Sequence, residues 1–245
     1  MKYTGSKARI SKEITSVFNK IIKENNVINY IEPFVGGANV IENVVCENKY
    51  GFDNNKYIIA FWNALLKGYE PPDFITREEW YNVKNNFANY PQEYVGLLGT
   101  CASYNGCWFT SYGGYSPTKT GKDRNYYYEA VINIKKQLPK LKNVKFAVRD
   151  YRYLKIEKMS NCLIYCDPPY EQGKHRYKNS NEFNHEEYWE WIRKVSKSNI
   201  VVCSEYTAPS DFNVIFEKQL AKTHPSQEKI SPTEKLFMYN KTSVS

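Results

Sequence analysis

The sequence predicts an α/β protein built on a doubly wound, Rossmann-like sheet with a small, mainly helical insertion. Short apolar runs alternate with segments of helical spacing on both sides of that insertion. The run 161–166 shows no polar alternation, which is typical of a strand buried on both faces. Two predicted strands run directly into polar motifs, at 33–39 and at 167–170. Motifs at the carboxyl ends of strands line the ligand crevice of a doubly wound sheet.

The composition fits one large domain or a core with an inserted lobe. The 245 residues are 42% hydrophobic, which is enough to bury a substantial core. No apolar run is long enough to span a membrane and the N-terminus lacks the apolar stretch of a signal peptide, so we expect a cytoplasmic protein. Six cysteines without a C-x-x-C pair and three scattered histidines favour free thiols, and they indicate neither a disulfide framework nor a metal site.

The charge balance favours a polyanionic partner. The net charge is +8 and the pI is near 9.0, and each phosphate that Lys or Arg neutralises releases a condensed counterion. The 22 tyrosines add aromatic planes between these cations, which is the combination that stacking on extruded bases requires. Many basic proteins bind no nucleic acid, and most of these rings are expected to pack or to line surfaces.

The N-terminal segment contains a candidate anion-binding loop. Thr4-Gly5-Ser6-Lys7 precedes a helix whose apolar residues keep a helical spacing from Ile10 to Ile22, with Ser11 as its expected cap. Backbone N–H groups and the Lys7 ammonium at the helix entrance suit an anion or a carboxylate. An ordinary N-terminal loop is the alternative.

A strand, a glycine turn and a helix follow, and this arrangement brings backbone close to a nucleotide-like cofactor. We expect the strand over 27–34, the turn at 35–39 with Gly36 and Gly37, and the helix over 39–46. The turn is not G-x-G-x-x-G, so no pyrophosphate is implied and a dinucleotide-dependent oxidoreductase is disfavoured. A plain tight turn is the alternative.

The second strand, around 50–52, ends in Asp53, which follows Gly37 by sixteen positions. In dinucleotide folds an acid at about this separation, at the tip of the second strand, binds the ribose hydroxyls. The alternative is a capping aspartate followed by Asn54 and Asn55.

From about residue 58 the pattern becomes helical and then loop-like. We expect helices over 58–66 and 91–98. Between them, a capping box of Thr76 and Glu79 is expected to open a further helix that continues to 87. The stretch 103–124 is rich in Gly, Tyr and Lys, and we interpret it as a flexible loop facing the substrate, with a solvated surface loop as the alternative. Its last three cations are Lys119, Lys122 and Arg124.

The second half of the chain returns to alternating strands and helices. Strands are expected over 144–148, 161–166, 199–203, 212–220 and 236–239. One helix is expected from Asn125 to Leu138, where Pro139 stops it, and another is expected to begin after a cap at Asn184. The strand 144–148 leads to Asp150, where an acid could reach a cofactor's base ring, although aspartates at strand ends are common.

Asp167-Pro168-Pro169-Tyr170 places a carboxylate at the mouth of the predicted sheet. The two prolines carry no backbone donor, so the chain is stiff, extended and rich in unpaired carbonyls, with the tyrosine ring at a fixed offset. This geometry suits a flat group that bears an amine, because the carboxylate and a proline carbonyl accept its two hydrogens while the ring stacks on its face. A strand that ends in a simple proline turn is the alternative.

These motifs together resemble the Dam-type DNA adenine methyltransferases of bacteria and phages. The resemblance is carried by Glu32-Pro33-Phe34-Val35-Gly36-Gly37, Asp53 and Asp167-Pro168-Pro169-Tyr170, in that order, and it covers nearly the whole chain. Tyr3-Thr4-Gly5-Ser6-Lys7 looks like the family's opening motif, and Tyr104-Asn105-Gly106 resembles a signature near the end of its recognition lobe. The resemblance implies a methyltransferase core at 1–57 and 125–245 and a target-recognition lobe at 58–124.

The resemblance also implies S-adenosylmethionine as the cofactor. Its methionine end would lie near Tyr3, Lys7 and the turn formed by Glu32, Pro33, Phe34, Gly36 and Gly37, its ribose on Asp53 and Asn54, and its adenine near Asp150 and Tyr151. Asp167, which also borders the cofactor, and Pro168, Pro169 and Tyr170 would hold the target adenine, with Phe183 or Tyr177 as the other wall of the pocket. The residues implied on the DNA side are Tyr104, Asn105, Lys119, Lys122 and Arg124.

The implied reaction needs no nucleophilic side chain and no metal, because the methyl donor is already an activated sulfonium and positioning supplies most of the catalysis. The implied partner is double-stranded DNA, from which the adenine must be flipped out, and we expect a monomer or a weak dimer without a membrane partner. Methylation of RNA adenine and a non-catalytic protein that binds DNA or cofactor are the alternatives. The insertion is short for the family's recognition lobe, so the target sequence is not assigned.

Overall fold

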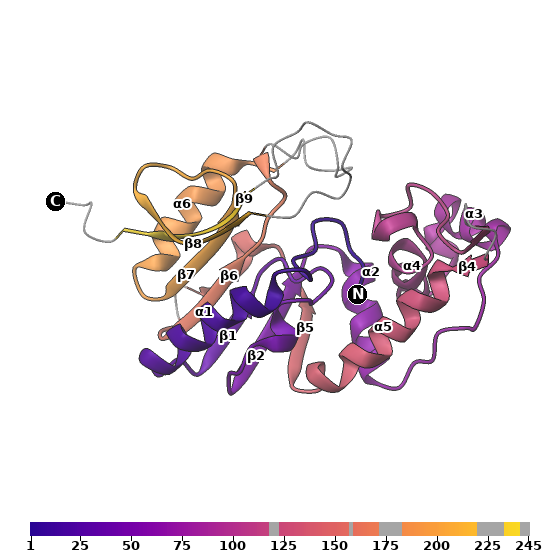
Figure 1. Cartoon of the computed structure of the whole chain (residues 1–245), viewed down its shortest axis with the longest axis horizontal. Helices are drawn as coiled ribbons and strands as arrows, with labels where there is room; N and C mark the ends of the chain where they lie inside the picture. The colour runs from indigo at the N-terminus through magenta and orange to yellow at the C-terminus, as the bar shows by residue number, and fades with distance from the viewer. Residues whose placement is uncertain (118–122, 157–158, 172–182, 220–232, 241–245) are drawn as a thin grey trace.

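The central sheet has seven strands, and the chain crosses it in a doubly wound order. The computed structural model describes residues 1–117, 123–156, 159–171, 183–219 and 233–240 (Figure 1). Within these residues the strands lie in the order β5-β2-β1-β6-β7-β9-β8. Their bounds are β1 Asn29–Glu32, β2 Asn48–Asp53, β5 Val144–Val148, β6 Cys162–Cys166, β7 Ile200–Glu205, β8 Phe212–Gln219 and β9 Thr233–Tyr239.

The strand order reverses between β1 and β6. β1 pairs in parallel with β2 on one side and with β6 on the other, and β5 and β7 extend the parallel part. β9 and β8 complete the sheet in antiparallel orientation. This is the predicted doubly wound, Rossmann-like sheet, whose ligand crevice lies at the carboxyl ends of the strands where the order reverses. The glycine turn follows β1 and Asp167 follows β6, so the fold brings both predicted motifs to one crevice.

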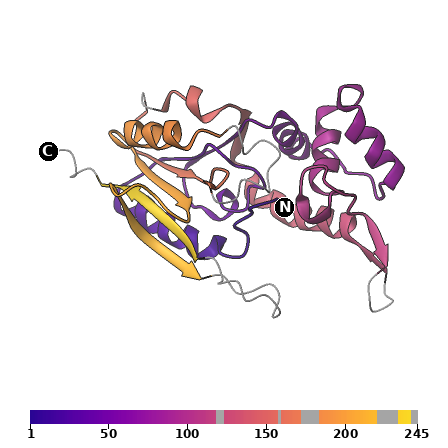
Figure 2. The same ribbon diagram turned by 90° about the horizontal axis from the view of Figure 1, so that it is seen from above.

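β6 is buried on both faces, as the sequence predicts. All five of its residues are buried, and alternate side chains enter different layers. Tyr165 packs against Phe18 of α1 (Ser11–Glu24), with ring centroids 4.9 Å apart. Ile164 instead joins the apolar cluster that contains Ile192 of α6 (His185–Ser196). Helices therefore cover both faces of the sheet, as the indigo and orange helices of Figure 2 show.

The start of α1 differs from the prediction. Ile10 occupies the N-cap position, and no side chain caps the helix. The Ser11 hydroxyl donates to the Ala8 carbonyl, 3.3 Å away, instead of accepting from the first turn. Ser11 lies one residue inside the helix, where a serine hydroxyl reaches back to preceding carbonyls.

The prediction of a helix over 39–46 is wrong. The segment forms a single 3-10 turn, η1 (Ile41–Asn43), and Val44 is already extended. The Asn43 side chain donates to the carbonyl of Asn39, which a continuing α-helix would need for a backbone N–H. Local side-chain bonds of this kind compete with helix formation.

α5 (Tyr126–Leu141) begins where predicted and runs further than predicted. The Asn125 side chain accepts a hydrogen bond from the backbone N–H of Tyr128, as an N-cap residue does. Pro139 lies inside the helix and does not stop it. The proline removes one backbone hydrogen bond from the last turn, and the helix ends two residues later, at Leu141.

The insertion packs beside the sheet, with α3 and α4 at the end far from β8 (Figures 1 and 2). A Cβ on Gly96 would lie 2.2 Å from the Tyr57 carbonyl oxygen, so only glycine allows α2 and α4 to approach this closely. The Thr76 hydroxyl accepts from the Glu79 N–H, which confirms the predicted start of α3. The elements are α2 (Lys56–Leu66), α3 (Arg77–Asn85), η2 (Phe87–Asn89), α4 (Gln92–Thr100), η3 (Tyr104–Gly106) and the hairpin of β3 (Tyr115–Pro117) and β4 (Asp123–Asn125).

Part of the stretch 103–124 is core rather than a flexible loop. Phe109 is buried, and its ring centroid lies 5.4 Å from that of Trp80. Trp108 packs edge-on against Phe109. Tyr104 and Tyr115 are exposed, as expected of rings on a contact surface. A lobe this small needs large aromatic side chains to build an interior, and the glycine-rich stretch supplies two of them.

All six cysteines are free thiols, as the spacing predicts. None of the helices in the described part of the chain is both long enough and apolar enough to cross a membrane.

The burial of β6 gives a test of the fold. Ile164 is fully buried, so Ile164→Ala should lower the free energy of unfolding by about 2 to 5 kcal/mol through lost apolar burial and a cavity. Ile28 is 49% exposed and serves as the matched control, for which we expect a change below about 0.5 kcal/mol. Urea unfolding followed by circular dichroism measures both. Equal effects at the two positions would contradict the predicted burial of β6.

Candidate active site

The glycine turn after β1 is anchored to the tip of β2. The backbone N–H of Val35 donates to the Phe52 carbonyl at 2.8 Å. The N–H of Gly36 donates to Oδ2 of Asp53 at 3.0 Å. Gly36 has φ +42°, and a Cβ there would lie 2.7 Å from the ring of Tyr3. The turn therefore needs glycine for its backbone conformation and for the ring of Tyr3, which packs directly against it.

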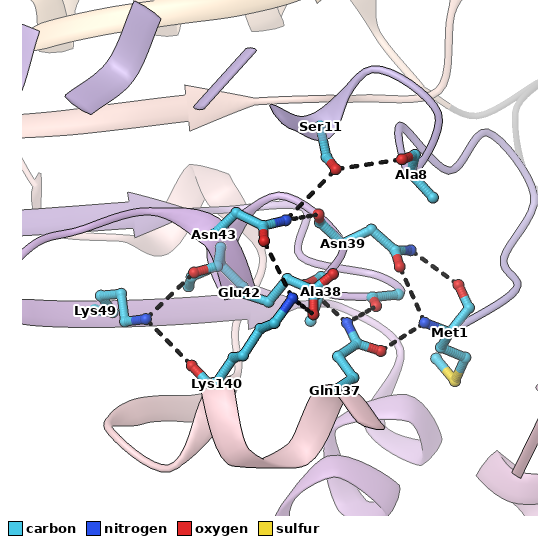
Figure 3. Close-up of polar contacts among 12 residues, drawn as sticks. Met1, Ala8, Ser11, Ala38, Asn39, Glu42, Asn43, Lys49, Gln137 and Lys140 are labelled. Atoms are coloured by element: carbon cyan, nitrogen blue, oxygen red, sulfur yellow. Dashed lines mark hydrogen bonds and ion pairs between the residues drawn. The ribbon is translucent and has the colours of Figure 1, made fainter. Parts of the chain in front are cut away.

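The opposite side of the turn is held by α5 (Figure 3). Nε2 of Gln137 donates to the carbonyls of Gly37 and Ala38, both at 3.0 Å. Oε1 of Gln137 accepts from the Met1 amine at 2.5 Å, and the same amine donates to Oδ1 of Asn39 at 3.0 Å. These buried contacts join the first residues, the turn and α5 into one polar cluster. They therefore hold the N-terminal segment and the glycine turn, both predicted to bind the cofactor, in a fixed position relative to each other.

Asp53 supports the turn through its carboxylate. Besides the Gly36 N–H, it accepts from the Asn55 N–H at 2.9 Å. Burial raises the pKa of Asp53, and the backbone donors oppose that rise. The cap of α2 is the Asn55 side chain and not Asp53, because Asn55 accepts from the N–H groups of Tyr57 and Ile58. Asn54, the other residue predicted near the ribose, is exposed at the same edge.

Glu32 lies beneath the turn. It is buried, accepts from the Tyr30 hydroxyl at 2.8 Å, and accepts from the Ile41 backbone N–H. Burial raises its pKa to about 8, although the Tyr30 hydrogen bond acts in the opposite direction. These contacts tie β1 to η1, so Glu32 braces the turn from within. Pro33, the next residue, is also buried.

An aromatic group stands at the far end of the turn. Phe34 lies 5.3 Å from Tyr151 and 6.0 Å from Phe183, measured between ring centroids. Asp150 is engaged by Arg152, whose Nε and Nη2 donate at 2.9 and 2.7 Å. The ring of Phe34, predicted at the methionine end of the cofactor, thus contacts Tyr151, predicted near its base, and the binding roles of Phe34, Asp150 and Tyr151 stay predictions.

Phe183 packs with the aromatic residues beside the glycine turn. Its ring centroid lies 6.0 Å from that of Phe34 and 5.7 Å from that of Tyr151, and the segments after β1 and β5 supply these apolar neighbours. Its role as a wall of the target pocket stays a prediction. The alternative wall, Tyr177, lies outside the described residues.

Lys7 and Asp167 form an ion pair at the crevice. Nζ of Lys7 lies 2.7 Å from Oδ1 of Asp167 and 4.5 Å from the ring centroid of Tyr170. The Lys7 side chain is 6% exposed and that of Asp167 is 20% exposed. Burial raises the pKa of Asp167, whereas the charge of Lys7 and its hydrogen bond oppose that rise. Lys7, predicted near the cofactor, therefore also acts on the predicted catalytic carboxylate. Pro168 is buried and Pro169 is partly buried in the same loop.

Two buried carboxylates near this pair were not singled out from the sequence. Oε2 of Glu234 accepts from the Tyr170 hydroxyl at 2.8 Å and lies 3.9 Å from Nζ of Lys7. Oε1 of Glu205 accepts from the Glu171 N–H at 2.9 Å, whereas its Oε2 has no partner among the described residues. Glu205 ends a buried strand, which is a usable signal. Glu234 follows a polar stretch, and its sequence context gives none.

The residues predicted on the DNA side lie on the inserted lobe. Tyr104 is 51% exposed, and Asn105 is exposed in a left-handed conformation. A Cβ on Gly106 would lie 2.5 Å from the Lys2 carbonyl oxygen, so this turn abuts the N-terminal segment. Arg124 is exposed and pairs with Glu129, with Nε 2.6 Å from Oε1. Lys119 and Lys122 lie outside the described residues.

The buried Glu32 carboxyl makes stability depend on pH. Its pKa is about 8 in the folded protein against 4.5 without burial, so between these values the folded state holds a proton that the unfolded state releases. The free energy of unfolding should fall as pH rises through this window, by about 1.4 kcal/mol per pH unit. Glu32→Gln should remove this contribution, because the amide keeps an acceptor for Tyr30 without a charge.

Urea unfolding of both proteins at several pH values in this window measures the difference between them. The pKa of Glu205 is also raised to about 8 by burial, so wild type and variant share that slope and only their difference reports on Glu32. Parallel stability curves for the two proteins would show that Glu32 is ionised in the folded state.

Comparison with known proteins places these motifs in a family. Residues 3–231 match the model of the D12 class N6 adenine-specific DNA methyltransferases. The type II methyltransferase M.MjaIII of Methanocaldococcus jannaschii is 25% identical over 201 residues, which cover 70% of this chain and 68% of that protein.

Solved structures give weaker similarities. TrmN from Thermus thermophilus is 10% identical with a TM-score of 0.36, and the match covers 90% of this chain and 47% of TrmN. A precorrin-6y C5,15-methyltransferase from Geobacter metallireducens gives 8% identity, a TM-score of 0.39 and coverages of 92% and 87%. The family match spans nearly the whole chain and includes both crevice motifs. The chain therefore belongs to the D12 class N6 adenine-specific DNA methyltransferases.

Proposed function

We propose that this enzyme transfers a methyl group from S-adenosylmethionine to the 6-amino group of an adenine flipped out of double-stranded DNA. The observation that carries the proposal is the meeting of two motifs. Asp167-Pro168-Pro169-Tyr170 follows β6, and the glycine turn follows β1, its parallel neighbour. A methyl donor on the turn and an amine on Asp167 would thus share one crevice, at the point where the strand order reverses.

The residues at the turn fit the proposed cofactor. Asp53 is a buried carboxylate fixed by two backbone N–H groups, and each carboxylate oxygen can accept further hydrogen bonds from ribose hydroxyls. The rings of Phe34 and Tyr151 offer apolar surface to a purine. When bound, S-adenosylmethionine supplies a methyl group already activated by a sulfonium charge. The chain's own residues then hold and orient the reacting groups.

Asp167 is the proposed acceptor for the target amine. The exocyclic nitrogen of adenine is a weak nucleophile because its lone pair is conjugated with the ring. Hydrogen bonds from that amine to the Asp167 carboxylate and the Pro168 carbonyl would favour a pyramidal nitrogen whose lone pair is free to attack. Lys7, 2.7 Å from Asp167, favours the ionised carboxylate that can accept such a bond.

Tyr170 and the inserted lobe would bind the base and the duplex. The Tyr170 ring is proposed to stack on the extruded adenine, whose removal from the helix costs a few kcal/mol. Arg124 and the exposed ring of Tyr104 lie on the lobe, where contacts to phosphates and bases would repay this cost. The net charge of +8 adds a general attraction to DNA.

Asp167→Ala should lower the rate of methyl transfer at least a hundredfold, on the order of the loss when one preorganised polar contact to a transition state is removed. The measurement is transfer of labelled methyl from S-adenosylmethionine to unmethylated genomic DNA, with the nucleosides separated and the modified sites mapped. Asp73→Ala, at an exposed position outside both crevice motifs, is the matched control and should keep the wild-type rate. Equal rates for wild type and Asp167→Ala would reject the proposed role.

Asp53→Ala should weaken S-adenosylmethionine binding by about tenfold or more, because it removes a buried, charged hydrogen-bond acceptor. Isothermal titration calorimetry in the absence of DNA measures this directly. Because Asp53 also fixes Gly36, the rate at saturating cofactor is measured alongside, and Asp73→Ala controls for the loss of one acidic side chain. Unchanged cofactor affinity in Asp53→Ala would contradict the proposal that Asp53 binds the ribose.

Side-by-side assays on duplex DNA and on RNA separate the proposed substrate from its alternative. Methyladenine formed in DNA within one short sequence context supports the proposal and also identifies the target. Methyl transfer confined to RNA would replace it.

A further inference from the structure

Glu234 lies behind the tyrosine of the Asp-Pro-Pro-Tyr loop. It belongs to β9, is 8% exposed, and follows the family-matched residues 3–231. Its Oε2 accepts from the Tyr170 hydroxyl at 2.8 Å and lies 3.9 Å from Nζ of Lys7. Glu234, which lies 64 positions after Tyr170 in the sequence, thus contacts both Tyr170 and Lys7 beside Asp167.

The hydrogen bond from Tyr170 to Glu234 restrains the plane of the tyrosine ring. The hydroxyl oxygen lies on the axis of the ring, so its bond to Glu234 holds the far end of the side chain and limits rotation about the first torsion. Because the O–H bond of a phenol prefers the plane of its ring, the fixed acceptor also favours one orientation of that plane. Tyr206 adds an edge-on contact at 4.9 Å between centroids and 86° between planes. Glu205 holds the backbone immediately after Tyr170 through the Glu171 N–H. β7 and β9 are neighbouring strands in which Glu205 pairs with Lys235, so Glu205 and Glu234 point to opposite faces of the sheet and contact the loop from two sides.

Glu234 also shares the Lys7 charge with Asp167. Lys7 lies closer to Asp167 than to Glu234, at 2.7 against 3.9 Å, and its ammonium stands 4.5 Å from the Tyr170 ring centroid. A second carboxylate on the same cation helps to hold the ammonium over the ring, where cation and ring attract each other. The position of Lys7 and the plane of Tyr170 are therefore linked through one side chain.

We propose that Glu234 is a positioning residue for the target adenine, acting through the Tyr170 hydroxyl. This inference rests on the proposed function, in which Tyr170 stacks on the flipped base. A fixed ring plane presents its face to the base before the base arrives, so less conformational freedom is lost on binding. Removing Glu234 leaves the stacking surface present but free to turn.

The test is a double-mutant cycle on Tyr170→Phe and Glu234→Ala, which report a shared interaction when their effects fail to add. Each single change should slow methyl transfer to DNA by on the order of tenfold at saturating S-adenosylmethionine, as expected for one lost charge-assisted hydrogen bond. The double variant should be no slower than either single variant. Glu234→Gln, whose amide oxygen still accepts from Tyr170, should recover most of the rate. Cofactor affinity measured by calorimetry should stay within about twofold throughout.

Glu217→Ala is the matched control, because Glu217 is exposed on the adjacent strand β8 and should leave every measured quantity at its wild-type value. Additive losses in the double variant, or a loss of cofactor affinity equal to the loss of rate, would overturn the inference. If Glu234→Ala does not fold, a wild-type rate for Tyr170→Phe overturns it on its own. Wild-type protein that transfers no methyl to DNA would instead reject the proposed function, which is a separate outcome.

Discussion

The contact between Lys7 and Asp167 is the constraint on which the crevice depends. It joins the N-terminal segment to the end of β6 across 160 residues of sequence. Taking two charges out of water carries a desolvation cost, so such a pair persists only with good geometry and additional partners. Here Gly5, Glu234 and the Tyr170 ring supply those partners around the lysine. Losing one member would leave a poorly compensated charge beside the proposed amine site.

The glycine turn is the second fixed point, and both helices that connect the sheet to the inserted lobe contact it. Nε1 of Trp62 in α2 donates to the Gly36 carbonyl at 2.9 Å, and Gln137 in α5 donates to Gly37 and Ala38. α5 begins directly after the hairpin that carries Arg124. A displacement of the lobe would therefore reach the turn through α2 and α5.

The sequence predicts the crevice well because its signals are local. β6 is recognisable from its unbroken apolar run, the prolines after it fix the backbone, and Asp53 lies where a strand tip and a glycine turn meet. The helix predicted over 39–46 fails for a local reason, because the Asn43 side chain donates to the Asn39 carbonyl. Other features depend on contacts between distant residues. Phe183 packs against Phe34, and Glu234 reaches Tyr170 because β9 lies beside β7. No local pattern encodes these two contacts.

Burial raises the pKa of four carboxyl groups around the crevice, and the groups differ in the partners that oppose this rise. At Asp53 and Asp167, which stand at strand tips, burial raises the pKa, and backbone N–H groups oppose that rise at Asp53 while Lys7 opposes it at Asp167. Glu32 and Glu205 lie deeper, and burial raises the pKa of each to about 8. A carboxyl that keeps its proton near neutral pH can brace backbone without adding charge to the crevice. The fold can therefore pack several acids around one crevice, and Lys7, 2.7 Å from Asp167, is the cation that acts on the carboxylate that the amine is proposed to meet.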